Sequence, residues 1–225
     1  KRSDREAAEG CVLADSKGNF AAALALKCET DFVAKNEDFI ALTKQILDLA
    51  IEKQPTSLEE LKSLNIENST VEQLIVDRIG VTGEKMELDI YEFVKGEDTA
   101  AYIHPGNKLA AVVAFNEKQV DEQVKKDVAM QVAAMSPIAL NRESVPADII
   151  ERELKVAKDK AIEEGKPENI IDRIAEGRLN KFYQETTLLE QAFIKDAKMS
   201  ISQYLKQEKD SLTVNDFKRI TLNQE

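Results

Sequence analysis

The sequence offers few residues that could carry out covalent catalysis. It contains one histidine, His104, and lacks a Walker-type phosphate loop, a GxGxxG motif after a predicted strand and a serine nucleophile elbow. One histidine cannot supply a metal site or a catalytic triad without partners, and the sequence marks none. Carboxylates are abundant, but among 42 acidic residues an accidental pair is expected and is weak evidence for catalysis. A hydrolase using two carboxylates remains an alternative. We expect no enzyme activity, no cofactor and no bound metal.

The segment from Glu29 to Phe39 is the most unusual part of the chain, because it places an acid and a phenyl ring, Asp31 and Phe32, where a strand passes into a helix. An exposed ring at such a corner can act as a wedge in a partner, since it offers a large apolar area with little rotamer entropy to lose. The same residues also fit ordinary roles, Phe32 in the core and Asp31 as a helix cap. The residues alone leave both readings open.

Composition and charge restrict the class of partner and the compartment. The net charge is -11, which argues against RNA or DNA as the main partner. No apolar run approaches the roughly 20 residues that span a bilayer, and the N-terminus has no apolar signal core. The cysteines, Cys11 and Cys28, are expected to be buried thiols in a reducing compartment. These features predict a cytoplasmic protein, not bound to a membrane, and the missing initiator Met indicates that the chain starts inside a longer protein.

The elements that position this corner belong to a hairpin followed by helices. Strand-like runs end in a loop rich in turn-forming residues, and Thr30 or Asp31 can cap the helix that follows. Apolar pairs then recur every seven residues, which predicts one amphipathic helix closed by Pro55. The pattern predicts strands over 11–14 and 20–28, helices from residue 31 to Pro55, over 58–64 and over 71–79 (ended by Gly80), and a strand over 85–94.

A second hairpin and helix repeat this plan. Residues 102–104 and 109–115 flank a tight turn at Pro105-Gly106-Asn107, and a helix is expected from about Asp121 to Met135. Each repeat alone would leave one sheet face bare, so we expect the two to pack around shared helices. A strand over 213–222 is expected to return to the second sheet.

Two apolar stripes separated by Gly165-Lys166-Pro167 predict an antiparallel helical hairpin, and 200–207 predicts a short helix. The apolar stripes can be buried either in a coiled coil within one chain or in a homodimer that forms through this arm. The predicted fold class is α+β, with two small antiparallel-sheet-plus-helix subdomains and a projecting coiled-coil hairpin. The predicted divisions are a linker remnant over 1–10, an N-terminal core subdomain over 11–95, a C-terminal core subdomain over 96–139 and 189–225, and the hairpin over 140–188.

Several segments resemble the elongation factor Ts family, the nucleotide exchange factors of the translational GTPase elongation factor Tu. Thr30-Asp31-Phe32-Val33-Ala34-Lys35 resembles the signature of that family. The resemblance runs in order from about Glu9 to Phe217. Its other segments are Met130–Ala134, Gly165–Pro167, Glu176–Phe182 and Leu189–Phe193.

The resemblance implies a guanine-nucleotide exchange factor that binds elongation factor Tu and has no direct nucleic-acid contact. In the family an Asp-Phe pair enters the GTPase near its magnesium site and speeds GDP release, and Asp31 and Phe32 match that pair. The other implied contacts are Ile79, Gly80, His104, Ile194 and Lys195. Ile79 and Gly80 fit an apolar anchor and a helix cap equally well, and His104 fits an indifferent turn residue.

The chain also departs from the family pattern in three places. The position of Lys195 is often apolar in the family. A small N-terminal three-helix domain usually precedes the matched region, and some members continue into a C-terminal helix after the position of Phe217. An acidic scaffold that uses its helical arm for self-association, or for holding another factor, remains an alternative to the exchange factor.

Overall fold

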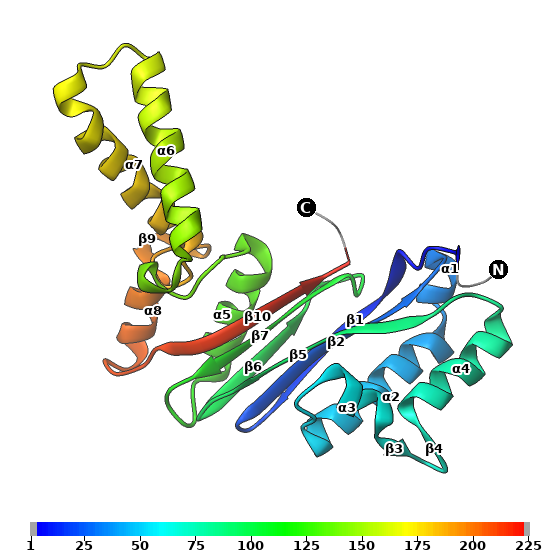
Figure 1. Cartoon of the computed structure of the whole chain (residues 1–225). Coiled ribbons are helices and arrows are strands. Elements are labelled where there is room, and N and C mark those ends of the chain that lie inside the picture. The colour runs from blue at the N-terminus through cyan, green and yellow to red at the C-terminus, as the bar shows by residue number, and fades with distance from the viewer. Residues whose placement is uncertain (1–3, 223–225) are drawn as a thin grey trace. The chain divides into compact units, whose positions relative to one another are not determined.

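The computed structural model describes residues 4–222. The chain forms two compact units: the first runs through Ala134 and resumes at Asn215, and the second comprises Met135–Val214. Helices and antiparallel strands occur together, which confirms the predicted α+β class (Figure 1). The finer division into a linker, two core subdomains and an arm stays a prediction. Among the described residues, the helices are all too short or too polar to cross a bilayer.

The first sheet has the strand order β1-β2-β5. β1 (Glu9–Lys17) and β2 (Phe20–Cys28) form the predicted antiparallel hairpin, with Lys17 opposite Phe20. The connection is therefore only Gly18-Asn19, shorter than the expected loop, and Gly18 has a φ of 61° that suits glycine in such a tight turn. β5 (Glu87–Lys95) pairs with the other edge of β2. This arrangement makes β2 the central strand.

One uninterrupted helix was predicted between residue 31 and Pro55, but the chain forms two helices there, so that prediction was wrong. α1 (Asp31–Ala34) is followed by α2 (Glu37–Lys53). Asn36 lies between them with an extended backbone, and its side-chain oxygen accepts hydrogen bonds from the N–H groups of Asp38 and Phe39. Asn36 thus caps a new helix instead of continuing the old one.

The helix predicted over 71–79 extends further than expected. α3 (Leu58–Ser63) is confirmed, and the small strands β3 (Asn65–Ile66) and β4 (Ser69–Thr70) lead into α4 (Val71–Thr82). Gly80 was expected to end this helix and does not. The cap is Gly83, at φ 76°, whose N–H donates to the carbonyl of Ile79 at 2.8 Å.

The second sheet has the strand order β10-β7-β6. β6 (Asp98–Ile103) and β7 (Leu109–Phe115) form the second predicted hairpin, and α5 (Glu122–Met135) follows it. The repeated plan of hairpin and helix is confirmed. The expected returning strand is also confirmed as β10 (Val214–Thr221), which pairs with β7.

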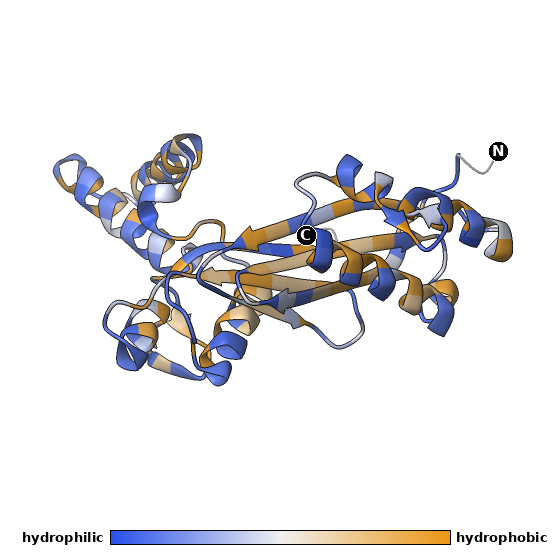
Figure 2. Cartoon of the chain, turned by 90° about the horizontal axis from the view of Figure 1, so that it is seen from below, coloured by the Kyte–Doolittle hydropathy of each residue, from blue (hydrophilic) through white to orange (hydrophobic). Residues whose placement is uncertain are grey.

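The two sheets of the first unit pack directly on each other, not around shared helices as expected. Side chains alternate along β2, so that its larger residues and Ala22 lie in the cluster with α2, whereas Ala21, Ala23 and Ala25 face the second sheet. Small side chains allow two sheets to approach closely. Figure 2 shows how apolar these strands are. The interface between the sheets includes Val12, Ala21, Ala23, Ala25, Ala110, Val112 and Ala114.

The second unit contains the predicted helical hairpin. α6 (Ala147–Glu163) and α7 (Ile171–Thr186) run antiparallel around Gly165, whose φ is 72° (Figure 1). Small residues, Ala157, Ala161 and Ala175, are buried in this pair. Coiled-coil packing and pairing with a second copy stay predictions. The remaining elements are the 3-10 turns Arg142–Ser144 and Glu168–Ile170, the strands β8 (Ala192–Phe193) and β9 (Asp196–Ser200), and the predicted short helix, α8 (Ile201–Glu208).

Candidate partner-binding site

Asp31 and Phe32 lie in the first turn after the first hairpin. Thr30 has an extended backbone, and its hydroxyl oxygen accepts a hydrogen bond from the N–H of Val33 at 3.3 Å, which starts α1. Phe32 is 85% exposed. Asp31 is exposed as well, and its carboxylate lies 3.6 Å from the ammonium group of Lys35. The core role considered for Phe32 is therefore wrong, and Thr30, not Asp31, is the residue that caps the helix.

A carboxylate from a distant part of the chain fixes this corner. Oε1 of Glu84 accepts hydrogen bonds from the backbone N–H groups of Glu29 and Thr30, both at 3.0 Å, and Oε2 accepts one from the Thr30 hydroxyl at 2.7 Å. Sequence reasoning missed Glu84, because the separation of 54 residues between it and Thr30 leaves no local pattern. The only local signal is its place directly after the glycine that caps α4.

Further contacts tie the end of α4 to the same corner. The Glu29 carboxylate accepts a hydrogen bond from the backbone N–H of Lys85 at 2.8 Å. Since the Glu84 carboxylate accepts one from the backbone N–H of Glu29, the two segments bind each other reciprocally. The guanidinium group of Arg78 lies 3.4 Å from the Asn36 side-chain oxygen and 3.7 Å from the Asp38 carboxylate. The corner and the last turns of α4 thus form one hydrogen-bonded assembly.

Ile79 and Gly80 lie inside α4, close along the chain to Glu84. Ile79 is half-buried and packs against the core cluster of the first unit, whereas Gly80 is exposed, with open space where a Cβ atom would stand. Val76 and Val81 on the same helix are 51% and 72% exposed. Cavities of about 400 Å³ and 300 Å³ include Val76 and Val81, respectively, in their linings. This helix therefore presents apolar surface around the predicted Ile-Gly pair.

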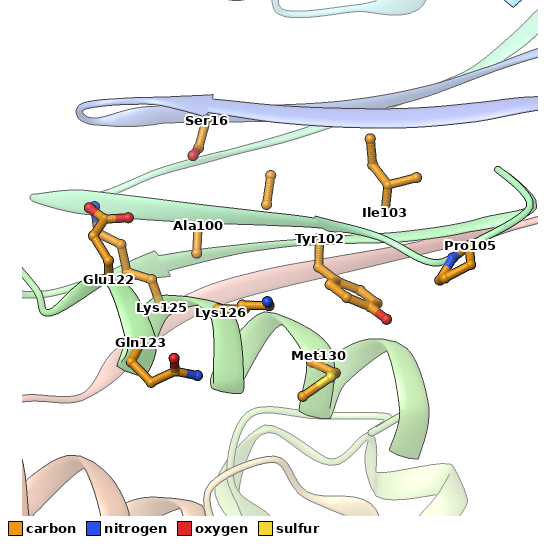
Figure 3. A pocket seen from close by; sticks show the side chains of 11 residues that line it. Ser16, Ala100, Tyr102, Ile103, Pro105, Glu122, Gln123, Lys125, Lys126 and Met130 are labelled. Carbon is orange, nitrogen blue, oxygen red and sulfur yellow. The ribbon is translucent and has the colours of Figure 1, made fainter.

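His104 follows β6 at the turn of the second hairpin. Its side chain is exposed, and Nδ1 lies 3.2 Å from the Tyr102 hydroxyl group. Tyr102 also lines a cavity of about 770 Å³ between β6 and α5. Figure 3 shows the Tyr102 ring pointing toward α5, on the side of Lys126 and Met130. His104 thus stands at the edge of an open, mixed polar and apolar surface.

The last predicted pair, Ile194 and Lys195, belongs to the second unit. Both residues are exposed in the turn between β8 and β9, and Ile194 is 48% exposed. The other predicted contacts are all in the first unit. Asp31 and Phe32 share one corner with the residues that hold α4, and His104 lies at the second hairpin turn of that unit.

The two thiols of the first hairpin are buried, and burial favours their neutral forms. Cys11 and Cys28 are free and buried, as predicted. Burial raises the pKa of Cys11 to about 11, and burial together with the negative charge of Glu84 raises the pKa of Cys28 to about 12. Within residues 4–222, no group of three or more His, Cys, Asp or Glu side chains could hold a metal ion. The fold and the corner therefore define an α+β protein that repeats a hairpin-and-helix plan and exposes a phenyl ring on it.

Known relatives identify the family. A family profile described as "Elongation factor TS" matches residues 29–224. A protein named elongation factor Ts from Porphyromonas gingivalis is 57% identical over 224 residues, which cover 99% of this chain and 81% of the relative. The one from Azobacteroides pseudotrichonymphae is 54% identical over 225 residues, covering 100% and 82%. The one from Bacteroides thetaiotaomicron is 41% identical over 282 residues, covering 100% and 85%. The chain belongs to the elongation factor Ts family.

Proposed function

We propose that this chain is a guanine-nucleotide exchange factor, which binds elongation factor Tu and speeds the release of GDP without covalent chemistry. The observation that carries the proposal is the 85% exposure of Phe32 beside Asp31, at a corner that several hydrogen bonds hold in place. Exposing a phenyl ring to water is unfavourable in the free protein. Inserting the ring into a partner would bury that apolar surface and contribute to binding. Family membership supplies the partner. We place this activity in the cytoplasm.

In this proposal the Asp31–Phe32 pair enters the GTPase beside the magnesium and phosphate site. A wedge accelerates release only if it binds the nucleotide-free partner better than the GDP-bound partner. Linkage then requires the converse, because GDP must weaken the grip of the exchange factor by the same factor. Ile79 and Gly80 on α4, His104 at the second hairpin, and Ile194 with Lys195 in the second unit are proposed as further contacts that hold the partner.

The test is release of fluorescent GDP from elongation factor Tu, chased with unlabelled nucleotide. We expect substoichiometric amounts of the chain to accelerate release, as a catalyst does. An Asp31→Ala, Phe32→Ala double variant should lose most of the acceleration, because buried aromatic anchors of an interface are worth about 2 kcal/mol or more. The chain contains no Trp, so its own fluorescence interferes little.

Three other outcomes would contradict parts of the proposal. Acceleration that survives in the double variant would keep the function and move the mechanism to Ile79, Gly80 and His104. Stoichiometric binding without acceleration would indicate a scaffold. No effect on a partner that responds to a full-length relative would overturn the exchange activity of this chain.

A further inference from the structure

The orientation of the proposed wedge cannot come from α1 itself. This helix has four residues, Asp31–Ala34, and ends at Lys35, whose N–H donates to the Asp31 carbonyl at 3.0 Å. An isolated helix of this length is unstable in water, because nucleation fixes several residues for very few hydrogen bonds. The direction in which Asp31 and Phe32 point must therefore be set by contacts with the rest of the unit, namely the packing of Val33 and Ala34 on the core and the hydrogen bonds made by the residues just before the helix.

Glu84 supplies the hydrogen bonds to the residues just before the pair. Its carboxylate engages the two residues before the pair, through the N–H groups of Glu29 and Thr30 and the hydroxyl group of Thr30. Hydrogen bonds to an ionised acceptor are about twice as strong as neutral ones. The Thr30 oxygen in turn caps α1 by accepting from Val33. A continuous chain of hydrogen bonds thus runs from Glu84 through Thr30 into the helix that carries Phe32.

Glu84 is itself held by α4. It follows Gly83, the cap of that helix, and its backbone N–H donates to the Thr82 hydroxyl oxygen at 3.2 Å. The same helix carries Ile79 and Gly80. The Glu84 carboxylate therefore joins two sets of proposed contact residues in one frame, so that both can meet a partner in a fixed geometry.

We infer that Glu84 is a positioning residue for Asp31 and Phe32, an inference that rests on the proposed exchange function. Glu84 need not touch the partner. It holds the corner in its binding conformation before the encounter, so that less conformational entropy is lost on binding. A corner without this carboxylate would present the ring in several directions, and only the competent fraction would drive release.

The test compares exchange rates at a fixed, sub-saturating concentration of the chain. We expect Glu84→Ala to slow the accelerated release of GDP about tenfold, because misplacement of a positioned group commonly costs that much or more. Glu84→Gln should recover most of the rate, since an amide oxygen can still accept from both N–H groups. Glu60→Ala is the matched control, because the Glu60 carboxylate similarly accepts from the N–H and hydroxyl groups of Thr56, at 2.8 and 2.9 Å, but lies at α3. The control should exchange like the original chain.

A double-mutant cycle separates positioning from general destabilisation. Adding Glu84→Ala to the Asp31→Ala, Phe32→Ala variant should change the residual rate very little, because nothing remains to be positioned. A full additional tenfold loss there would overturn the inference, as would a Glu84→Ala variant that exchanges like the original chain. Should Glu84→Ala fail to fold, Thr30→Val decides by the same criteria, because it removes the hydroxyl group that links the Glu84 carboxylate to the N–H of Val33 and so breaks the proposed hydrogen-bond chain.

Hydrogen exchange of the free chain tests the corner without a partner. The amides of Glu29 and Thr30 should lose protection in Glu84→Ala and keep it in Glu60→Ala. Unchanged protection would overturn the positioning role. If these amides lose protection in Glu84→Ala but the original chain does not accelerate GDP release, the proposed exchange function is wrong. Glu84 would then stabilise this corner without a role in nucleotide exchange.

Discussion

The two strand-to-helix corners of the first unit are held by similar hydrogen bonds but differ in burial. After β2 the chain enters α1, and after β7 it enters α5, where the Asp121 carboxylate accepts from the N–H groups of Gln123 and Val124. At each corner a carboxylate from another segment accepts hydrogen bonds from the backbone, from two N–H groups at the first corner and from one at the second. Glu84 does so at the first corner, and Asp98 binds the N–H of Val120 at 3.0 Å at the second.

The difference lies in which way each corner faces. Asp98 is 7% exposed and also bonds the ammonium group of Lys125 at 3.0 Å, and Val120 is 7% exposed. Burial alone would lower the pKa of Lys125, but its hydrogen bonds to Asp98 and Glu122 raise that pKa above the usual value. At the first corner, by contrast, Phe32 is 85% exposed. A carboxylate that binds backbone N–H groups therefore stabilises a buried corner after β7 and an exposed corner, which carries Phe32, after β2.

The largest expected effect is a loss of stability at the second corner. Asp98→Ala should lower the free energy of unfolding by about 3 kcal/mol, because it removes the acceptor of two buried N–H groups, those of Val120 and Thr99, and the more buried of the two carboxylates that pair with Lys125. Denaturant unfolding measures this change. Glu122→Ala is the control, since Glu122 bonds Lys125 at 3.2 Å but its side chain is 91% exposed. Equal losses from the two variants would contradict the view that this corner is a core element.

A smaller effect should distinguish the apolar side chains of the two corners. Val120→Ala should cost about 1 to 2 kcal/mol of stability, because it leaves a cavity, and should leave GDP exchange per folded molecule unchanged. Phe32→Ala should change stability by less than about 0.5 kcal/mol and slow exchange. Unfolding curves and the GDP-release assay together measure both. A Phe32→Ala variant that loses stability and keeps its exchange rate would reverse the comparison.

The sequence predicted both hairpins, the helix after each and the helical hairpin, because these depend on local periodicity and turn residues. It could not predict the break at Asn36, since Phe32, Phe39 and Ile46 keep their spacing across it and the competing cap is a local hydrogen bond. Gly80 was taken as a helix end because glycine is a common cap, yet here it lies on the exposed side of α4 at no steric cost.

The candidate site was only partly predictable for a different reason. Motif resemblance could point to Asp31 and Phe32, but whether the ring is buried depends on packing. The role of Glu84 depends on a contact across 54 residues. The direct packing of the two sheets was missed as well, because alternate alanines in a strand do not reveal whether a helix or a second sheet covers that face.

The smallest expected effect concerns the thiols, which occur in the first hairpin and not in the second. The pKa values of Cys11 and Cys28 are raised to about 11 and about 12 from a usual value of 9.0, so the folded state favours the neutral thiols. The unfolded chain therefore releases protons first as pH rises above 9, and stability falls through the range up to the folded pKa values. Between pH 8 and pH 9.5 the loss should be below about 1 kcal/mol per thiol.

A Cys11→Ala, Cys28→Ala variant isolates this contribution, because every other alkaline titration is common to both proteins. Its stability at pH 8 should be lower, since alanine fills less space than cysteine, but its further decline toward pH 9.5 should be shallower than that of the original chain. Denaturant unfolding at a series of pH values measures the two slopes. Equal slopes would mean that the thiols ionise as readily in the folded hairpin as in the unfolded chain, which burial beside the carboxylate of Glu84 should prevent.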